Sequence, residues 1–224
     1  MGSMEERSGL MIGVRFERDV EAVVCIGAHP DDIEVGAAGL IASLARANQT
    51  TRFLFAIAAG DDTREDEAMA SAQDLLGDRV KVVFGRMTDN MLPYAHIRES
   101  KQFIRQASEM ISPDLVIAPH IGDRHQDHRF VAELAHQIFR SQMILEYEIV
   151  KLEGDLGKPA IYHPMTSDEA AAKLDHLESH FASQQGKHWY HRETFAGLMR
   201  IRGVECLATD GYAEAFHANR VTLA

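Results

Sequence analysis

Residues 23–34 read VVCIGAHPDDIE, and this stretch decides the fold that the rest of the sequence completes. The apolar run at 23–26 is rich in β-branched residues and has the length of a buried strand. A polar loop follows it, and an Ala- and Leu-rich pattern over residues 34–48 predicts a helix. A buried strand that leads through a polar loop into a helix is the first half of a strand–helix–strand unit.

The alternation of strand and helix continues along the chain. Further strands are predicted at residues 52–58, 80–84, 115–118 and 144–150, and further helices at 64–76, 96–111, 128–139 and 167–184. The tail after residue 203 is expected to be irregular, with short strands. We therefore predict an α/β, Rossmann-like open sheet that is mostly parallel and flanked by helices. We interpret residues 11–224 as a single domain and residues 1–10 as a tag or disordered start.

Composition and motifs limit the class of protein. The chain has 224 residues and a formal net charge of −11, which argues against sequence-independent binding to nucleic acid. It has no apolar run of bilayer-spanning length and no visible secretion signal, so no membrane insertion is expected. Cys25 and Cys206 lie far apart and fit a reducing cytoplasm. The first strand is not followed by G-x-G-x-x-G, which excludes the usual dinucleotide-binding loop.

The loop after the first predicted strand carries His29, Asp31 and Asp32. Ligands of an open α/β sheet bind beyond the carboxyl ends of the strands, where this loop lies. A tight turn there can direct an imidazole and a carboxylate at one metal ion, because Zn²⁺ accepts both kinds of ligand. The neighbouring carboxylate of Asp31 can instead face water and act as a general base. The alternative is that an aspartate caps the next helix while His29 packs beneath it.

A second polar loop, residues 119–129, reads PHIGDRHQDHR and follows another buried strand. His128 from this loop would complete a site of two histidines and one carboxylate with an open position, as catalytic zinc sites require. His125 shares a helical face with His128 and can stabilise an oxyanion or protonate a leaving amine. The alternatives are a solvated acidic loop and a helix N-cap at Asp127.

The two loops together, HPDD at 29–32 and HQDH at 125–128, resemble those of the LmbE-like, or PIG-L-type, N-acetylglucosaminyl deacetylases. The resemblance extends to REDEA at 64–68, DLV at 114–116 and YAEAF at 212–216. It implies that His29, Asp32 and His128 bind Zn²⁺ or another divalent transition metal. It further implies that Asp31 is the general base and that His125 stabilises the tetrahedral intermediate.

The same resemblance implies what the protein acts on. Members typically hydrolyse the N-acetyl group of an amino sugar or its conjugate to a free amine and acetate, so a small N-acetylated sugar is the expected substrate. Relatives often assemble, and a homo-oligomer is compatible with this. The alternatives are a zinc amidase that cleaves a thiol-conjugate or other non-sugar amide, and a non-catalytic metal- or sugar-binding protein on the same fold.

The loop at 58–63 departs from the family pattern, because it reads AAGDDT where relatives usually carry a Thr-x-Gly-Glu-like stretch. Asp61 and Asp62 are candidates for contacts to sugar hydroxyls or an amine, with solvated or helix-capping carboxylates as the alternative. Arg64 resembles a substrate-contacting arginine of the family. Its alternative is a weak surface pair with Glu67.

Three further residues are candidates for the functional site. Two lie near the end of the chain, and one lies in the second loop. Glu214 and His217 are interpreted, through the resemblance, as contacts at the rim of the substrate pocket. Asp127 is expected to orient His125 or a metal ligand from behind.

Overall fold

The computed structural model describes residues 13, 16, 18–218 and 220–221. The predicted tag or disordered start at residues 1–10 lies outside these residues. Strand β1 (Ala22–Gly27) is buried along its whole length, and α1 (Asp32–Ala47) follows it after a short loop. Helix α1 packs very close to the sheet, since a Cβ at Gly36 would lie 2.3 Å from the ring of Tyr147. The first strand–loop–helix unit therefore sits in the middle of the core.

Seven strands of the described chain form one sheet in the order β3-β2-β1-β4-β5-β7-β6. The other strands are β2 (Arg52–Ala59), β3 (Val80–Met87), β4 (Leu115–Pro119), β5 (Met143–Tyr147), β6 (Ile161–Met165) and β7 (Tyr212–Ala218). Neighbours from β3 to β5 are parallel, and β7 is antiparallel to both β5 and β6. The chain moves outward from β1 to β3 and then crosses back to β4. The switch point, where ligands bind in such sheets, therefore lies between β1 and β4.

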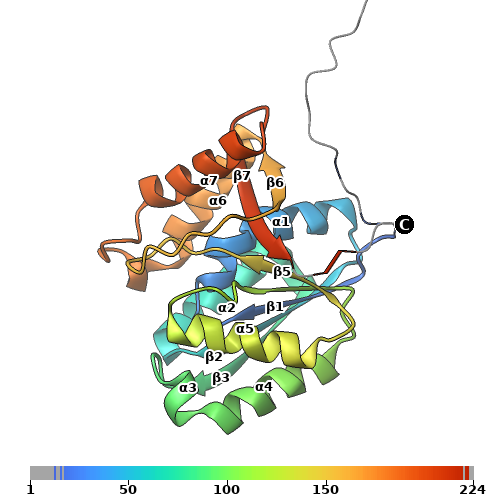
Figure 1. Cartoon of the computed structure of the whole chain (residues 1–224), viewed down its shortest axis with the longest axis vertical. Coiled ribbons are helices and arrows are strands. Elements are labelled where there is room, and N and C mark those ends of the chain that lie inside the picture. Colours follow the sequence, from blue (N-terminus) through green and yellow to red (C-terminus); the bar gives the residue numbers. More distant parts are fainter. Residues whose placement is uncertain (1–12, 14–15, 17, 219, 222–224) are drawn as a thin grey trace, which may run out of the picture.

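Helices cover both faces of the sheet, as Figure 1 shows. The remaining helices are α2 (Asp62–Leu76), α3 (Leu92–Ala95), α4 (Ile97–Met110), α5 (Gln126–Ile138), α6 (Ser167–His180) and α7 (Arg192–Glu205). Alternate β1 residues serve different faces. Val23 belongs to the core cluster that includes residues of α1, α2, α6 and α7, whereas Val24 belongs to the cluster that includes residues of α3, α4 and α5. This two-sided burial explains why β1 reads as a continuous apolar run. The predicted α/β open sheet is confirmed.

The C-terminal part of the prediction is wrong in its detail. The helix expected at 167–184 ends at His180, and α7 was not predicted. The tail was expected to be irregular with short strands, and it contains one strand of seven residues, β7, which is paired on both sides; β6 was missed. Helix α7 contains Gly197 and Gly203, which lower helix propensity. Gly203 is needed for packing, since a Cβ there would lie 2.1 Å from the carbonyl oxygen of Gly211. Tertiary contacts thus override a weak local signal.

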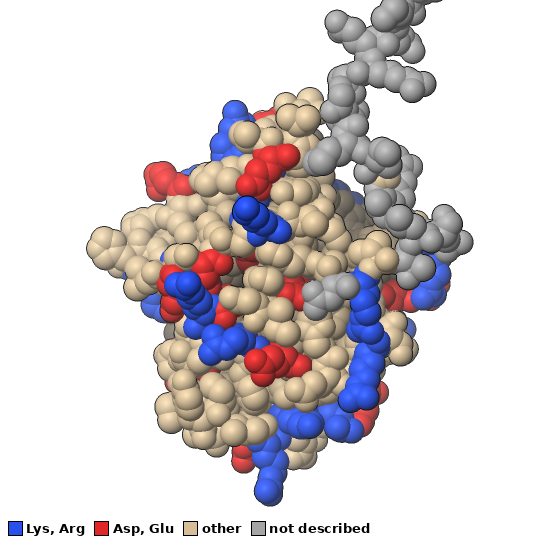
Figure 2. All heavy atoms as spheres, viewed as in Figure 1, with Lys and Arg blue, Asp and Glu red and all other residues tan. Residues whose placement is uncertain are grey.

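The surface agrees with the composition. Within the described residues, no helix combines the length and apolar character that crossing a bilayer requires. Figure 2 shows Lys and Arg side chains together with Asp and Glu side chains across one face, with uncharged areas between them. Both signs of charge therefore occur on this face, and the absence of nucleic-acid binding stays a prediction from the net charge.

Glu214 connects the C-terminal strand to two helices, through hydrogen bonds to α1 and a buried ion pair with α6. The Glu214 carboxylate on β7 accepts hydrogen bonds from the backbone N–H groups of Gly39 and Leu40, both at 2.7 Å. It also accepts one from Lys173 Nζ at 2.6 Å. Glu214 is 4% exposed and Lys173 6% exposed. These contacts occupy both carboxylate oxygens, which favours a packing role for Glu214 over the predicted substrate contact.

Replacing Glu214 by alanine is expected to lower the free energy of unfolding by about 3–5 kcal/mol, because Lys173 is left buried without its counter-charge. Denaturant unfolding of the folded protein measures this change. The matched control is Glu178→Ala, which removes a half-exposed carboxylate paired with Arg192 and should change stability by about 1 kcal/mol or less. Equal effects of the two substitutions would contradict the structural role of Glu214.

Candidate metal centre

The loop between β1 and α1 is a strained turn held by one carboxylate. Asp32 Oδ2 accepts hydrogen bonds from the backbone N–H groups of Ala28 at 2.9 Å and His29 at 2.8 Å. Asp31 has a φ of 112°, a conformation that costs about 1–3 kcal/mol in a residue other than glycine. Its side chain makes no capping hydrogen bond to α1. The alternative role of Asp31 as a helix cap is therefore wrong, and the strain directs its carboxylate elsewhere.

His29, Asp32 and His128 converge at the switch point. His29 Nδ1 lies 3.2 Å from His128 Nε2, and the Asp32 carboxylate lies 3.6 Å from the first nitrogen and 3.4 Å from the second. Two ligands of a tetrahedral ion with bonds of about 2.1 Å are about 3.4 Å apart. Their ligand atoms all lie within 4.8 Å of one another, and all three residues are buried. The donor types and spacing fit a divalent transition metal such as Zn²⁺.

Carboxylates hold both imidazoles from behind. His29 Nε2 lies 2.8 Å from Asp89 and 3.2 Å from Asp127, while His128 Nδ1 lies 3.0 Å from Asp123. Metal-binding histidines usually donate their second nitrogen to such a carboxylate, which leaves the first nitrogen unprotonated. In the neutral, metal-binding form of each ring the second nitrogen would be the donor, and the lone pairs of His29 Nδ1 and His128 Nε2 would face the same point. This fixes the direction in which the two rings can bind an ion.

Backbone N–H groups hold the carboxylate of Asp127 in place. It is completely buried, and its two oxygens accept hydrogen bonds from the N–H groups of Asn90 at 2.7 Å and Leu92 at 3.1 Å. His29, His125 and Asp127 form another group with ligand spacing. We favour the group with Asp32 and His128, because it leaves Asp127 in the supporting position behind His29.

Asp31 and Arg64 form an ion pair beside the three candidate ligands. Arg64 Nη2 lies 3.0 Å from Asp31 Oδ1 and donates to the carbonyl of Pro30 at 3.1 Å. Its Nε is buried and has no hydrogen-bond partner among the residues that the structure describes. Glu67, the alternative partner of Arg64, instead accepts a hydrogen bond from the backbone N–H of Ser183 at 2.7 Å. Arg64 therefore pairs with Asp31 and not with Glu67, and a contact between Arg64 and the substrate stays a prediction.

His125 lies next to the candidate ligands. Its ring centre is 4.6 Å from that of His128 and 5.1 Å from that of His29. His125 caps α5, since its Nδ1 accepts a hydrogen bond from the backbone N–H of Asp127 at 3.3 Å; the alternative cap at Asp127 is wrong. Burial, followed by the charges of His128 and His29, lowers the pKa of His125. A neutral ring that accepts at Nδ1 carries its proton on Nε2, which is then a donor.

The remaining predicted residues are more peripheral. Asp61 caps α2, with its carboxylate accepting from the backbone N–H of Arg64 at 3.0 Å, and Asp62 is exposed in the first turn. His217 stacks on His120 with ring centres 3.8 Å apart. The cap role of Asp61 was one of the two interpretations of the sequence. Substrate contacts by Asp61, Asp62 and His217 stay predictions.

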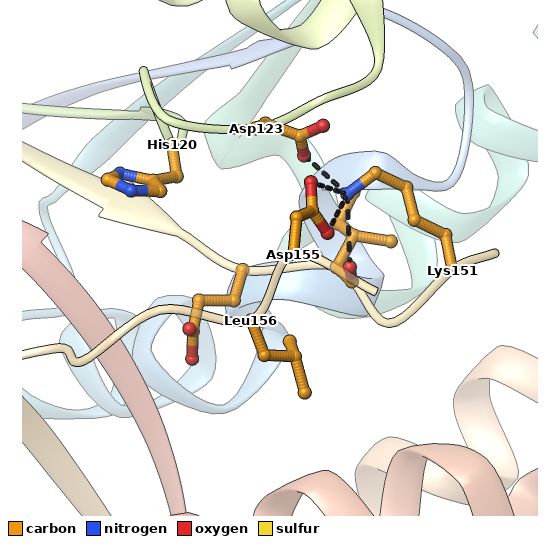
Figure 3. A pocket seen from close by; sticks show the side chains of 7 residues that line it. His120, Asp123, Lys151, Asp155 and Leu156 are labelled. Carbon is orange, nitrogen blue, oxygen red and sulfur yellow. Dashed lines mark hydrogen bonds and ion pairs between the residues drawn. The ribbon is translucent and has the colours of Figure 1, made fainter. Parts of the chain in front are cut away.

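Sequence reasoning assigned no role to Asp89, Asp123 or Lys151. Lys151 Nζ donates to Asp123 Oδ2 at 2.7 Å and is also bonded to Asp155 at 3.1 Å (Figure 3). A small hollow borders Asp123, Lys151 and Asp155, with His120 and Leu156 in its wall. None of the three candidate ligands lines this hollow, so it lies behind His128. A signal for Asp89 existed, since it follows β3 in the same way that His29 follows β1.

The fold and these contacts define an α/β protein with two histidines and a carboxylate at the switch point of its sheet. The chain belongs to the PIG-L family, because the family model, GlcNAc-PI de-N-acetylase, matches residues 24–139, more than half of its length. This segment contains both loops that carry the candidate ligands. Family membership supports an N-deacetylase that hydrolyses N-acetyl groups.

Solved structures share the fold at low identity. N,N'-diacetylchitobiose deacetylase from Pyrococcus horikoshii has 22% identity and a TM-score of 0.71, with 90% of this chain and 84% of that chain covered. The 4-carboxy-2-hydroxymuconate hydratase GalB of Pseudomonas putida KT2440 has 19% identity and a TM-score of 0.72, covering 91% and 99%. The zinc-inhibited form of teicoplanin deacetylase Orf2 has 16% identity and a TM-score of 0.66, covering 91% and 100%. At these identities the likeness concerns the fold.

Metal affinity is expected to fall as the pH falls. Burial lowers the pKa of His128, but the carboxylates of Asp32 and Asp123 outweigh this effect and raise it to about 9 in the protein alone. Below that pH the ring is protonated, so an ion must displace the proton to bind. The apparent dissociation constant for Zn²⁺ should therefore rise about tenfold per pH unit between pH 8 and 6 for each displaced proton. Calorimetric titrations at several pH values measure it, and a pH-independent constant would contradict this arrangement.

Proposed function

We propose that this protein is a zinc-dependent N-deacetylase that hydrolyses the N-acetyl group of an amino sugar or amino-sugar conjugate. The main support for this proposal is that two adjacent aspartates in one turn have different partners. Asp32 faces the two histidines, whereas the adjacent Asp31 pairs with Arg64 beside them. One turn therefore supplies a metal ligand and a separate carboxylate for proton transfer. Membership of the PIG-L family supports the same chemistry.

His29, Asp32 and His128 would hold the ion. A divalent ion in such a site lowers the pKa of water and polarises a carbonyl group. These three ligands leave a position for water and substrate, as in catalytic zinc sites. Asp89, Asp127 and Asp123 keep the two rings oriented from behind.

Asp31 would move the proton. Burial, and then the charge of Asp32, raises the pKa of Asp31 to about 7, while Arg64 and His29 act in the lowering direction. A general base is most effective when its pKa lies near the working pH. The Asp31 carboxylate takes a proton from water as the oxygen attacks the acetyl carbon. It returns that proton to the amide nitrogen as the C–N bond breaks, which gives acetate and a free amine.

His125 and Arg64 would act on the substrate. The Nε2–H of His125 is a donor for the oxyanion that develops on the acetyl oxygen. Arg64 lies beside Asp31, 3.0 Å from its carboxylate, and is the candidate to donate a hydrogen bond to a polar group of the substrate.

The division of roles between neighbouring aspartates is testable. Asp31→Asn should keep the zinc ion bound by His29, Asp32 and His128 and lower kcat by about 10²–10⁴-fold, because it removes only the general base. His29→Ala should lose the zinc ion of this site together with the activity. Metal analysis of the purified variants and an acetate-release assay measure the two effects. The control is Asp66→Asn, an exposed carboxylate on α2, which should leave both unchanged. Equal loss of zinc in the Asp31 and His29 variants would refute this division.

The reaction class is testable with the wild-type protein. Acetate release from N-acetylglucosamine derivatives, dependent on zinc and on Asp31, is the expected result. One structural neighbour is named as a 4-carboxy-2-hydroxymuconate hydratase, so the same fold also occurs in a protein named for a different reaction. The panel therefore includes bulkier amides and unsaturated carboxylic acids. Turnover of either class without acetate release from any N-acetyl sugar would overturn the proposal.

A further inference from the structure

A second group of ligand-type side chains lies on helices α2 and α6. Asp74 from α2 and His176 and His180 from α6 have ligand atoms within 4.8 Å of one another. We call these three residues the outer cluster. Both helices pack on the same face of the sheet, and the outer cluster shares no residue with the site at the switch point. Nothing in the proposed deacetylation uses it.

The geometry of the outer cluster is that of a metal site across two helices. His176 and His180 are four residues apart, so they lie on one face of α6, with ring centres 4.4 Å apart. Asp74 Oδ2 lies 3.3 Å from His176 Nδ1 and 3.1 Å from His180 Nε2. Both imidazoles therefore present a nitrogen to the same carboxylate oxygen. Two imidazoles and one carboxylate suit Zn²⁺ and similar divalent ions.

His176 is held from behind in the way that metal-binding histidines are. Its Nε2 lies 2.8 Å from Ser71 Oγ, and the Ser71 hydroxyl donates to Glu34 Oε1 at 2.7 Å. A hydroxyl has one proton, so when it donates to Glu34 the ring must donate from Nε2. His176 Nδ1 then carries a lone pair that faces the Asp74 carboxylate. A cation between them resolves this repulsion, and the second nitrogen is fixed as metal sites require.

The exposure of the outer cluster agrees with this geometry. The side chain of Asp74 is 65% exposed, so water can complete the coordination. The other chemistry that Asp74, His176 and Ser71 suggest is a nucleophilic serine. That role is excluded, because Ser71 is completely buried.

We propose that Asp74, His176 and His180 bind a divalent transition metal ion such as Zn²⁺, and that this ion joins α2 to α6. The bound ion is structural. It links two helices that are far apart in sequence. His176, one of its ligands, is hydrogen-bonded to Ser71, and Ser71 is hydrogen-bonded to Glu34 in the first turn of α1. Because it involves separate residues, the proposal does not depend on the proposed deacetylase activity.

Zinc stoichiometry tests the outer cluster. Wild-type protein equilibrated with Zn²⁺ and freed of excess ion by gel filtration should contain two ions per chain. Asp74→Asn and His180→Ala should each contain one, and their affinity for the second ion should fall at least tenfold. The matched controls are Asp175→Asn, an exposed carboxylate beside His176, and His188→Ala, an exposed histidine; both should keep two ions.

Two further readouts separate the possible results. Asp74→Asn should keep acetate release while losing the rise in melting temperature that the second ion gives to the wild type. Loss of one ion with activity retained supports the proposal, even if the substrate class proves different. A wild type with one ion, lost in His29→Ala but kept in Asp74→Asn, would show that the outer cluster is only ion-paired and would overturn it.

Discussion

The candidate site depends on the hydrogen bonds that Asp32 accepts from the backbone of Ala28 and His29. These bonds fold the chain back at the end of β1, so that α1 starts directly over the strand. The turn forces Asp31 into a left-handed backbone conformation. Asp32 is thereby directed at the two histidines, and Asp31, which precedes it, is directed at Arg64. The same turn brings α1 against the sheet at Gly36, so the site and the core are built by one local constraint.

Burial of so many charged groups requires that each has a partner. The two histidines are buried together with Asp32, Asp123 and Asp127, and their mutual contacts offset the cost of removing charge from water. Carboxylates lower the cost of protonated imidazoles, which is why the pKa of His29 and of His128 is raised despite burial. A divalent cation can replace those protons. The site is thus a buried group of carboxylates and imidazoles that binds positive charge, either as protons or as a divalent cation.

The two halves of the sheet serve different purposes. The parallel half, from β3 to β5, presents its carboxyl ends to the site. It gives Asp89 and His29 from the loops after β3 and β1, and His128 from the first turn of α5, which follows β4. The antiparallel end with β7 contributes Glu214, which locks α1 and α6 from within the core. The C-terminal strand therefore supports the turn without entering it. This explains why a motif near the end of the chain resembles the family although its carboxylate is used in packing.

The sequence by itself determined the open α/β fold and the two loops of the site. Apolar strands, turn residues and helical periodicity are local signals, and parallel strands bring their carboxyl ends to one edge. Tertiary structure decided which carboxylates support the imidazoles. Asp123 lies in the same loop as His128, but only the folded chain places its carboxylate between His128 and Lys151, and only folding brings Asp89 to His29. Tertiary structure also decided that Glu214 packs against α1 and α6 and that residues 192–205 form helix α7. Their contacts join residues more than a hundred positions apart or depend on close packing at glycine, and such contacts exist only after the chain has folded.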